Sequence, residues 1–253
     1  MGLIVPAVLP TSREDLEEKL ALFCRIPMVS RIQIDVVDGL FASPASWPYS
    51  PSTKSDLVLG KPQELEVMMQ RGEMLPHLDR IAYEIDLMCL DAERASETWL
   101  GLGASRLTFH AESATNLPKL LASSRKRYGA GGLVSGLVSF GCALNIESDL
   151  SLVEQCIGLP GQGEVGYVQF MGIARIGSQG QLFDKRVLEK IKTFRAQHPE
   201  ITLQVDGGVS LENAKELLNL GVSNLIVGSA IINAKDPSAV FAKFESLQAP
   251  YGV

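Results

Sequence analysis

Three aspartates stand inside apolar segments of the chain, where an acidic side chain is costly to bury. Asp35 lies within the run QIDVV, Asp86 within EIDLM and Asp206 within QVDGG. A carboxylate in such a place is expected to be paired, bound to a metal or catalytic. Proton transfer and coordination of a divalent cation are therefore the chemistry these residues could perform. Asp38, next to a glycine, is expected instead to be a structural acid.

Two glycine-ended segments near the C-terminus could hold a phosphate group. The first is VDGGV, with Gly207 and Gly208, and the second is VGSAI, with Gly228 and Ser229. Glycine has no Cβ atom, so backbone N–H groups can approach an anion closely there. The alternative is that both segments are only tight turns between a strand and a helix. Their place after the last two expected strands favours the phosphate site.

Eight short apolar runs are expected to form the strands that carry these residues. Continuous apolar runs are typical of strands buried on both faces of a parallel sheet. The runs are Leu3–Leu9, Arg31–Val36, Ala82–Met88, Arg106–Phe109, Gly136–Leu144, Tyr167–Ile173, Thr202–Val205 and Asn224–Val227.

Amphipathic segments between the runs are expected to form helices. Ser12, Ser210 and Asp236 have the residue types that cap a helix start, and Gly221 has the type that caps a helix end. The expected helices are the LEEKLALF segment after Ser12, Pro62–Arg71, Asp91–Leu100, Leu117–Tyr128, Asp149–Cys156, Asp184–Gln197, Ser210–Leu220 and Pro237–Leu247.

Alternating strands and helices predict an α/β fold built from right-handed parallel crossovers. Eight units favour a (β/α)₈ TIM barrel that is a single domain over residues 1–253, with an open doubly wound sheet as the alternative. In a barrel, Gln33 and Asp35 point to the same face, and the three aspartates converge at one mouth. The loop Phe41–Lys61 follows the second strand on that face, in the position of a lid.

Composition narrows the classes of partner. The net charge of −6 argues against nucleic acid as a partner but does not exclude a local phosphate site. The apolar N-terminus is short and interrupted by Pro6, so neither a signal peptide nor a membrane span is expected. The four cysteines lack CxxC spacing and are expected to be free thiols in a cytoplasmic protein. A homo-oligomer is left open.

These motifs resemble the ribulose-phosphate 3-epimerase family over almost the whole chain. The pieces VDGGVSLENA and GSAI are shared with other ribulose-phosphate-binding barrels, whereas IDVVDG and ALN point more narrowly to the epimerase. The pieces are IDVVDGLF at Ile34–Phe41, the IDLM that ends at Met88, LTFHAES at Leu107–Ser113, CALNIE at Cys142–Glu147, GSQGQLF at Gly177–Phe183, VDGGVSLENA at Val205–Ala214 and GSAI at Gly228–Ile231.

The resemblance implies an isomerase that acts on a small phosphorylated sugar of pentose phosphate metabolism. In that family, one aspartate removes the proton at C3 and a second returns a proton from the opposite face. Asp35 and Asp206 occupy these two positions. A divalent metal, held by two histidines and the same aspartates, stabilises the enediolate between the steps. The loop of Gly177, Ser178, Gln179 and Gly180 matches the family's phosphate loop.

The chain departs from the family at the metal site. Gln33 and Asp86 replace the two metal-binding histidines, and Ala7 replaces a serine of the first strand. The phosphate loop, usually PGFGGQ, reads IGSQGQ here and needs a one-residue insertion. Without imidazoles, Asp35, Asp86 and Asp206 form an oxygen-rich set that suits Mg²⁺ or Mn²⁺ better than Zn²⁺, if a metal is bound at all.

Five further residues are expected to line the site: Met88, His110, Asn145, Met171 and Arg175. For His110 the alternative is a hydrogen-bonded residue of the barrel, and for Arg175 it is a solvated loop side chain. Two functions therefore stay open. The first is an epimerase, favoured by the aspartate pair. The second is a non-catalytic or diverged phosphosugar-binding barrel, favoured by the lost histidines. A lyase ranks lower, because the second strand has no lysine.

Overall fold

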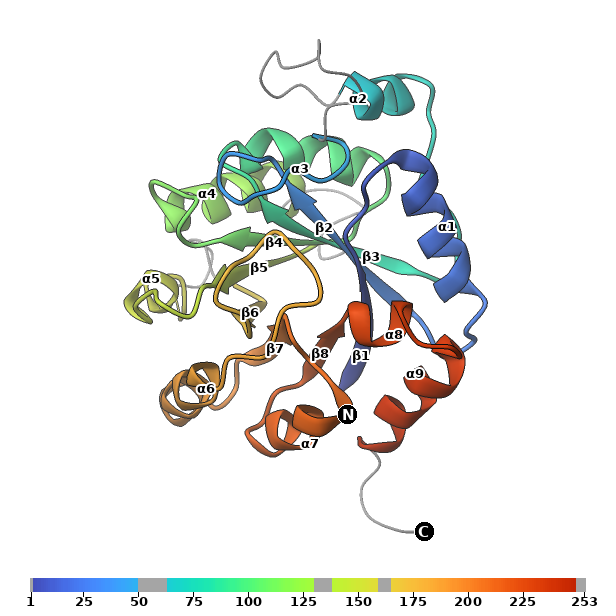
Figure 1. The fold of residues 1–253 in the computed structure, drawn as a ribbon. Coiled ribbons are helices and arrows are strands. Elements are labelled where there is room, and N and C mark those ends of the chain that lie inside the picture. The colour runs from blue at the N-terminus through green and yellow to red at the C-terminus, as the bar shows by residue number, and fades with distance from the viewer. Residues whose placement is uncertain (1, 50–62, 130–137, 159–164, 249–253) are drawn as a thin grey trace.

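Eight parallel strands close into a barrel in the order β1 to β8, with β8 paired to β1 (Figure 1). The computed structural model describes residues 2–49, 63–129, 138–158 and 165–248. This confirms the (β/α)₈ barrel and excludes the open doubly wound sheet. The strands are β1 (Leu3–Val8), β2 (Arg31–Val37), β3 (Ala82–Met88), β4 (Arg106–His110), β5 (Ser139–Leu144), β6 (Tyr167–Met171), β7 (Thr202–Asp206) and β8 (Asn224–Val227).

Helices follow the strands and form the outer ring of the barrel (Figure 1). The additional short helix α8 was not expected from the sequence. Where the expected helix ran to Tyr128, the structure ends α4 at Ser124 and continues as a π-helical turn, η1 (Arg125–Gly129). The helices are α1 (Arg13–Cys24), α2 (Gln63–Gln70), α3 (Ala92–Gly101), α4 (Leu117–Ser124), α5 (Ser151–Glu154), α6 (Arg186–Gln197), α7 (Leu211–Asn219), α8 (Ser229–Ile232) and α9 (Pro237–Ser246).

The capping residues act as the sequence indicates. The Ser12 side chain accepts a hydrogen bond from the backbone N–H of Asp15, and Ser210 forms a capping box with Asn213 at the start of α7. Asp236 caps α9, whose first residue is a proline. These contacts satisfy backbone N–H groups that have no partner inside a helix, and so they fix where each helix begins.

The two faces of the strands differ in polarity. Ile34, Val36 and Ile85 belong to the apolar core, whereas Gln33 and Asp35 carry hydrogen bonds into the barrel interior. The interior is therefore lined by polar residues at alternate strand positions, as the period of a strand requires. The parallel register places Asp35 of β2 beside Asp86 of β3. Two of the three aspartates therefore lie side by side on neighbouring strands.

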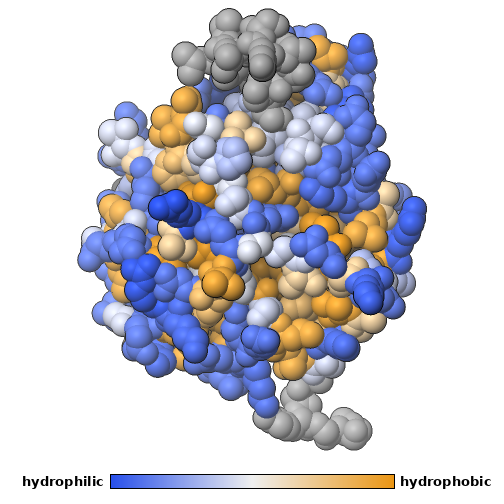
Figure 2. Space-filling model, viewed as in Figure 1, coloured by the Kyte–Doolittle hydropathy of each residue, from blue (hydrophilic) through white to orange (hydrophobic). Residues whose placement is uncertain are grey.

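Other expectations fall partly within the described residues. Cys24, Cys89, Cys142 and Cys156 are free thiols. No helix in the described part of the chain is long and apolar enough to cross a membrane. Of the expected lid, residues 41–49 are irregular and residues 50–61 lie outside the described ranges. Figure 2 shows hydrophobic and hydrophilic residues interspersed over one face. A homo-oligomer stays a prediction.

Candidate active site

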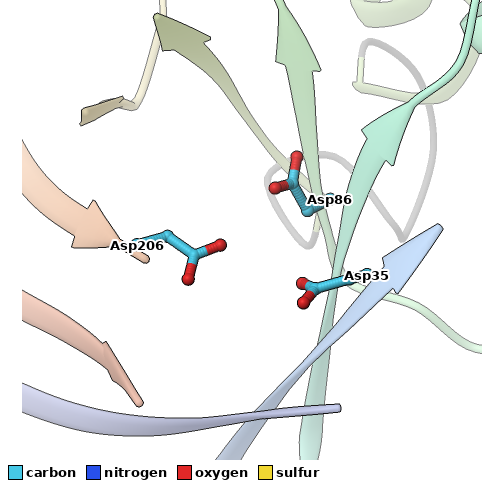
Figure 3. Close-up of side chains that lie close together, drawn as sticks. All are labelled: Asp35, Asp86 and Asp206. Carbon is cyan, nitrogen blue, oxygen red and sulfur yellow. The ribbon is translucent and has the colours of Figure 1, made fainter. Parts of the chain in front are cut away.

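The three aspartates meet inside one end of the barrel (Figure 3). Asp35 lies near the C-terminal end of β2, Asp86 lies near the C-terminal end of β3, and Asp206 is the last residue of β7. Carboxylate oxygens of all three lie within 4.8 Å of one another. The expected convergence of the acids is confirmed. Asp35 and Asp206 keep 6% and 8% of their surface exposed, whereas Asp86 has 0%, so only the first two face the open cavity described below.

Gln33 connects the two accessible acids. Its side-chain Nε2 donates to Asp35 Oδ1 and to Asp206 Oδ2, each at 2.8 Å. Because an amide nitrogen has two hydrogens, one Gln33 side chain can hold both carboxylates at once. Gln33 therefore orients the acid pair.

Burial and mutual repulsion disfavour the charged forms of this pair. Burial raises the pKa of Asp35 well above its usual range, and the nearby Asp206 and Asp86 carboxylates raise it further. Burial, followed by the charge of Asp86, raises the pKa of Asp206 to about 7. Close carboxylates that cannot all ionise share protons, and this is the property that acid and base catalysis near neutral pH requires.

The same shift predicts how stability depends on pH. The pKa of Asp206 is 3.8 in the unfolded chain and about 7 in the folded protein. Between about pH 4 and about pH 7 the folded protein therefore binds more protons than the unfolded chain does. The free energy of unfolding of the metal-free protein should therefore fall as pH rises from about 4 to about 7. Urea denaturation in a chelator across this range should show the slope. Asp206→Asn should flatten it, and an unchanged slope in that variant would contradict the shift.

Asp86 is held from two other strands. His110 Nε2 of β4 lies 3.0 Å from Asp86 Oδ1, and Gln169 Nε2 of β6 donates to Asp86 Oδ2 at 2.9 Å. Burial lowers the pKa of His110, but the nearby carboxylates, Asp86 first and then Glu112 and Asp206, together raise it above its usual value. His110 is fully buried, and it does not line the cavity described below. Its structural role is the expected alternative, a hydrogen-bonded residue of the barrel.

A cavity open to solvent lies over the acid pair. Its walls include Met88 and Met171 beside Asp35 and Asp206. Every residue expected to bind phosphate also lines this cavity, so the loop of residues 177–180, the two glycine turns and the acids face one space. These residues are Gly177, Ser178, Gln179, Gly180, Gly207, Gly208, Gly228 and Ser229.

The glycine turns depend on the missing side chain. Gly208 has φ +66°, and a Cβ atom there would lie 2.7 Å from backbone atoms of Phe183. At Gly228 the backbone is not in the left-handed region, but a Cβ atom would lie 2.6 Å from Gln179 Nε2 and 3.4 Å from the Ala7 carbonyl oxygen. Gly208 is thus required by the fold, whereas Gly228 keeps space open in the cavity.

This difference makes Gly228→Ala a clean probe of the phosphate site. The added methyl group would enter the cavity beside the Gln179 side chain, so affinity for inorganic phosphate should fall by roughly tenfold or more, about 1.4 kcal/mol, with the fold retained. Calorimetric titration measures the affinity. Gly166→Ala is the matched control, because its Cβ would be similarly crowded, 2.9 Å from Ser139 Oγ, outside the cavity. Equal phosphate affinity in both variants would place the anion elsewhere.

Arg175 and Asn145, like His110, do not line the cavity. Arg175 is exposed, and its backbone carbonyl accepts a hydrogen bond from the Gln181 side chain. Asn145 lies at the end of β5, where its backbone N–H donates to Glu112 and its carbonyl accepts from Lys190. A role for either residue in ligand binding therefore stays a prediction. Asp38 is a structural acid as expected, since it accepts three backbone N–H groups of neighbouring loops.

The donor set fits an oxygen-bound divalent cation. Three carboxylates bring negative charge together, and His110 is the basic side chain of the described residues that contacts them. Gln33 Oε1 is buried and lacks a hydrogen-bond partner. Carboxylate and amide oxygens are ligands that Mg²⁺ and Mn²⁺ prefer, and the cluster contains no thiolate or free imidazole for Zn²⁺.

Comparison with known proteins identifies relatives of this chain. A profile described as the ribulose-phosphate 3 epimerase family matches residues 64–232. This range contains β3 to β8, with Asp86, Asp206 and the glycine turns. The chain belongs to the ribulose-phosphate 3-epimerase family. Asp35 and Gln33 precede the matched range.

Curated relatives carry the name of the same epimerase. One from Schizosaccharomyces pombe is 26% identical over 63% of this chain, and the alignment spans only 64% of that relative's length. Another, from Mycobacterium leprae, is 26% identical over 95% of this chain and 92% of the relative. A rice relative named as a cytoplasmic isoform is 30% identical over 55% of this chain and 57% of its own. Identity to the family is therefore low but extends over nearly the whole barrel.

Solved structures share the fold at lower identity. A 3-hexulose-6-phosphate synthase has a TM-score of 0.62 at 18% identity, covering 98% of this chain and 100% of that one. A 3-keto-L-gulonate-6-phosphate decarboxylase from Vibrio cholerae has a TM-score of 0.61 at 14% identity, covering 97% and 96%. At this identity the likeness concerns the barrel alone.

Proposed function

We propose that the chain is an epimerase that moves a proton at C3 of a ketose phosphate, with Asp35 and Asp206 as its acid and base. One observation carries the proposal. Both aspartates line the cavity that the glycine turns of β7 and β8 also line. A sugar phosphate anchored at those turns would therefore lie against the acid pair.

One aspartate acts as the base and the other, in its protonated form, acts as the acid. A base next to C3 takes the proton, and the carboxylic acid on the other side returns one to the opposite face. The pKa of Asp206, raised to about 7, allows either form to exist near neutral pH. Gln33 hydrogen-bonds both carboxylates at 2.8 Å, so both are already oriented when the substrate binds.

The cofactor proposed for this site is Mg²⁺ or Mn²⁺, held by Asp35, Asp86 and Asp206. When bound, such a cation would offset the negative charge that develops on the substrate oxygens. Asp86 remains sealed behind the cavity and contributes charge and not contact with the sugar. The rice relative's name supports a cytoplasmic location, which we also propose.

A second function is favoured by one specific observation. The Gln33 amide already satisfies both acids at the position where the family has a metal-binding histidine. A barrel that binds phosphosugars without turnover would keep the glycine turns and tolerate this bridge. Such a protein binds the ligand with the same affinity whether or not Mg²⁺ is added.

Conversion of substrate separates the two functions. D-ribulose 5-phosphate is incubated with the protein in Mg²⁺, in Mn²⁺ or in a chelator, and its C3 epimer is followed by proton NMR. The epimerase forms the epimer in at least one metal. Binding of the sugar phosphate without any epimer in all three conditions would support the second function and overturn the first.

A further inference from the structure

Three buried side-chain amides form a chain that ends on Asp86. Asn224 Nδ2 of β8 donates to Gln204 Oε1 at 3.3 Å, and Gln204 Nε2 of β7 donates to Gln169 Oε1 at 2.8 Å. Gln169 Nε2 of β6 then donates to Asp86 Oδ2 at 2.9 Å. We call Asn224, Gln204 and Gln169 the amide relay. It runs across the barrel interior and joins strands that are not neighbours of β3.

Carboxylates fix the direction of the relay. Gln204 Nε2 also donates to Glu84 Oε1, which lies two residues before Asp86 on the same face of β3. A carboxylate oxygen accepts hydrogen bonds, so the amide nitrogens of Gln204 and Gln169 must both face β3. Their oxygens then have to accept from the preceding amide. Each member of the relay therefore holds one orientation, and the Gln169 N–H always points at Asp86.

Asp86 depends on this contact more than Glu84 does. Arg106 Nε lies 2.9 Å from Glu84 Oε2, so Glu84 has a cationic partner. Within the described residues, no lysine or arginine is paired with Asp86, and its two oxygens rest on His110 and Gln169. A fully buried carboxylate that loses one of two donors leaves an unsatisfied oxygen and gains freedom to rotate.

We propose that Gln169 is a positioning residue that presents Asp86 to the divalent cation without touching the cation itself. The inference rests on the proposed metal site. On this proposal, the amide relay holds Asp86 in the orientation in which it binds the cation. Outer contacts of this kind typically change metal affinity by about 10–100-fold when they are removed. Gln169 therefore belongs to the cation site even though it does not line the cavity.

Cation affinity measured without substrate tests the proposal. Mn²⁺ is titrated into the metal-free protein and free Mn²⁺ is followed by electron paramagnetic resonance. Gln169→Met keeps the length of the side chain and removes the donor, so Mn²⁺ affinity should fall by about 10–100-fold. Gln169→Leu gives a second variant of similar volume, in case the first fails to fold. Gln197→Leu, on the exposed end of α6, is the control and should bind Mn²⁺ as the wild type does.

Phosphate affinity is measured on the same samples, because the glycine turns report an intact barrel. Folded Gln169 variants that bind Mn²⁺ as tightly as the wild type would overturn the proposal, as would a wild type without Mn²⁺ affinity. Failure of the proposed function looks different. In that case the wild type forms no C3 epimer, while Mn²⁺ affinity still falls in the Gln169 variants.

Discussion

Replacing either Asp35 or Asp206 by asparagine is expected to abolish proton exchange at the ligand while phosphate binding stays nearly intact. Asparagine keeps the shape of the side chain and can neither take nor return the proton. Loss of general acid–base catalysis typically lowers the rate by about 10²–10⁴-fold. The anion is expected to contact the turns of β7 and β8, so its affinity should change little. Each carboxylate touches Gln33, and the amide of asparagine can still accept from it through its oxygen.

The rates are measured as deuterium exchange into the sugar phosphate, and the affinities by calorimetry with inorganic phosphate. Asp79→Asn is the control, because Asp79 is exposed between α2 and β3. Full exchange activity in both catalytic-site variants would rule out the two-aspartate mechanism. A variant that loses phosphate binding and exchange together would instead indicate a damaged barrel, which circular dichroism detects.

The second large effect is expected from introducing two imidazoles beside the acid pair. The double variant Gln33→His, Asp86→His replaces an amide and a carboxylate with the nitrogen ligands that favour zinc. The purified double variant should retain about one Zn²⁺ per chain, whereas the wild type should not prefer zinc. The replaced residues lie beside Asp35 and Asp206, so the new ligands and the old acids can share one ion.

Elemental analysis after dialysis against a weak chelator measures the retained metal. Gln197→His adds an imidazole on the exposed end of α6 and controls for zinc bound adventitiously at the surface. Two results would contradict the account. One is a wild type that already holds one tightly bound Zn²⁺, and the other is a folded double variant that retains none.

The fold was predictable because its signal is repeated along the chain. Buried parallel strands give continuous apolar runs, and eight of them separated by amphipathic segments leave few topologies. Boundaries were less predictable. The expected helix ran to Tyr128, whereas α4 ends at Ser124 and the chain continues as a π-helical turn, which the sequence pattern does not distinguish from an α-helix. The short helix α8 has only four residues, too few for a periodic pattern to indicate it.

Part of the site was predictable from residue type alone. A carboxylate is costly to bury, so an aspartate in a buried strand indicates pairing, metal binding or catalysis. Glycine after the last two strands indicates the end of the barrel where ligands bind. The contacts of Arg175 and Asn145 were not predictable, because loop position does not determine where a side chain points. Gln169 was missed altogether, although a signal existed. Polar residues recur two positions apart in β3, β6 and β7, which is the mark of a polar barrel interior.

Deuterium incorporation tests the central claim most directly, since it detects the proton transfer itself. The wild-type protein is incubated with D-ribulose 5-phosphate in D₂O, with Mg²⁺ or Mn²⁺, and C3 is examined by NMR. The account predicts deuterium at C3 in at least one of these metals, and loss of that exchange in Asp206→Asn. Absence of deuterium at C3 under every metal condition, in a protein that still binds phosphate, would contradict it.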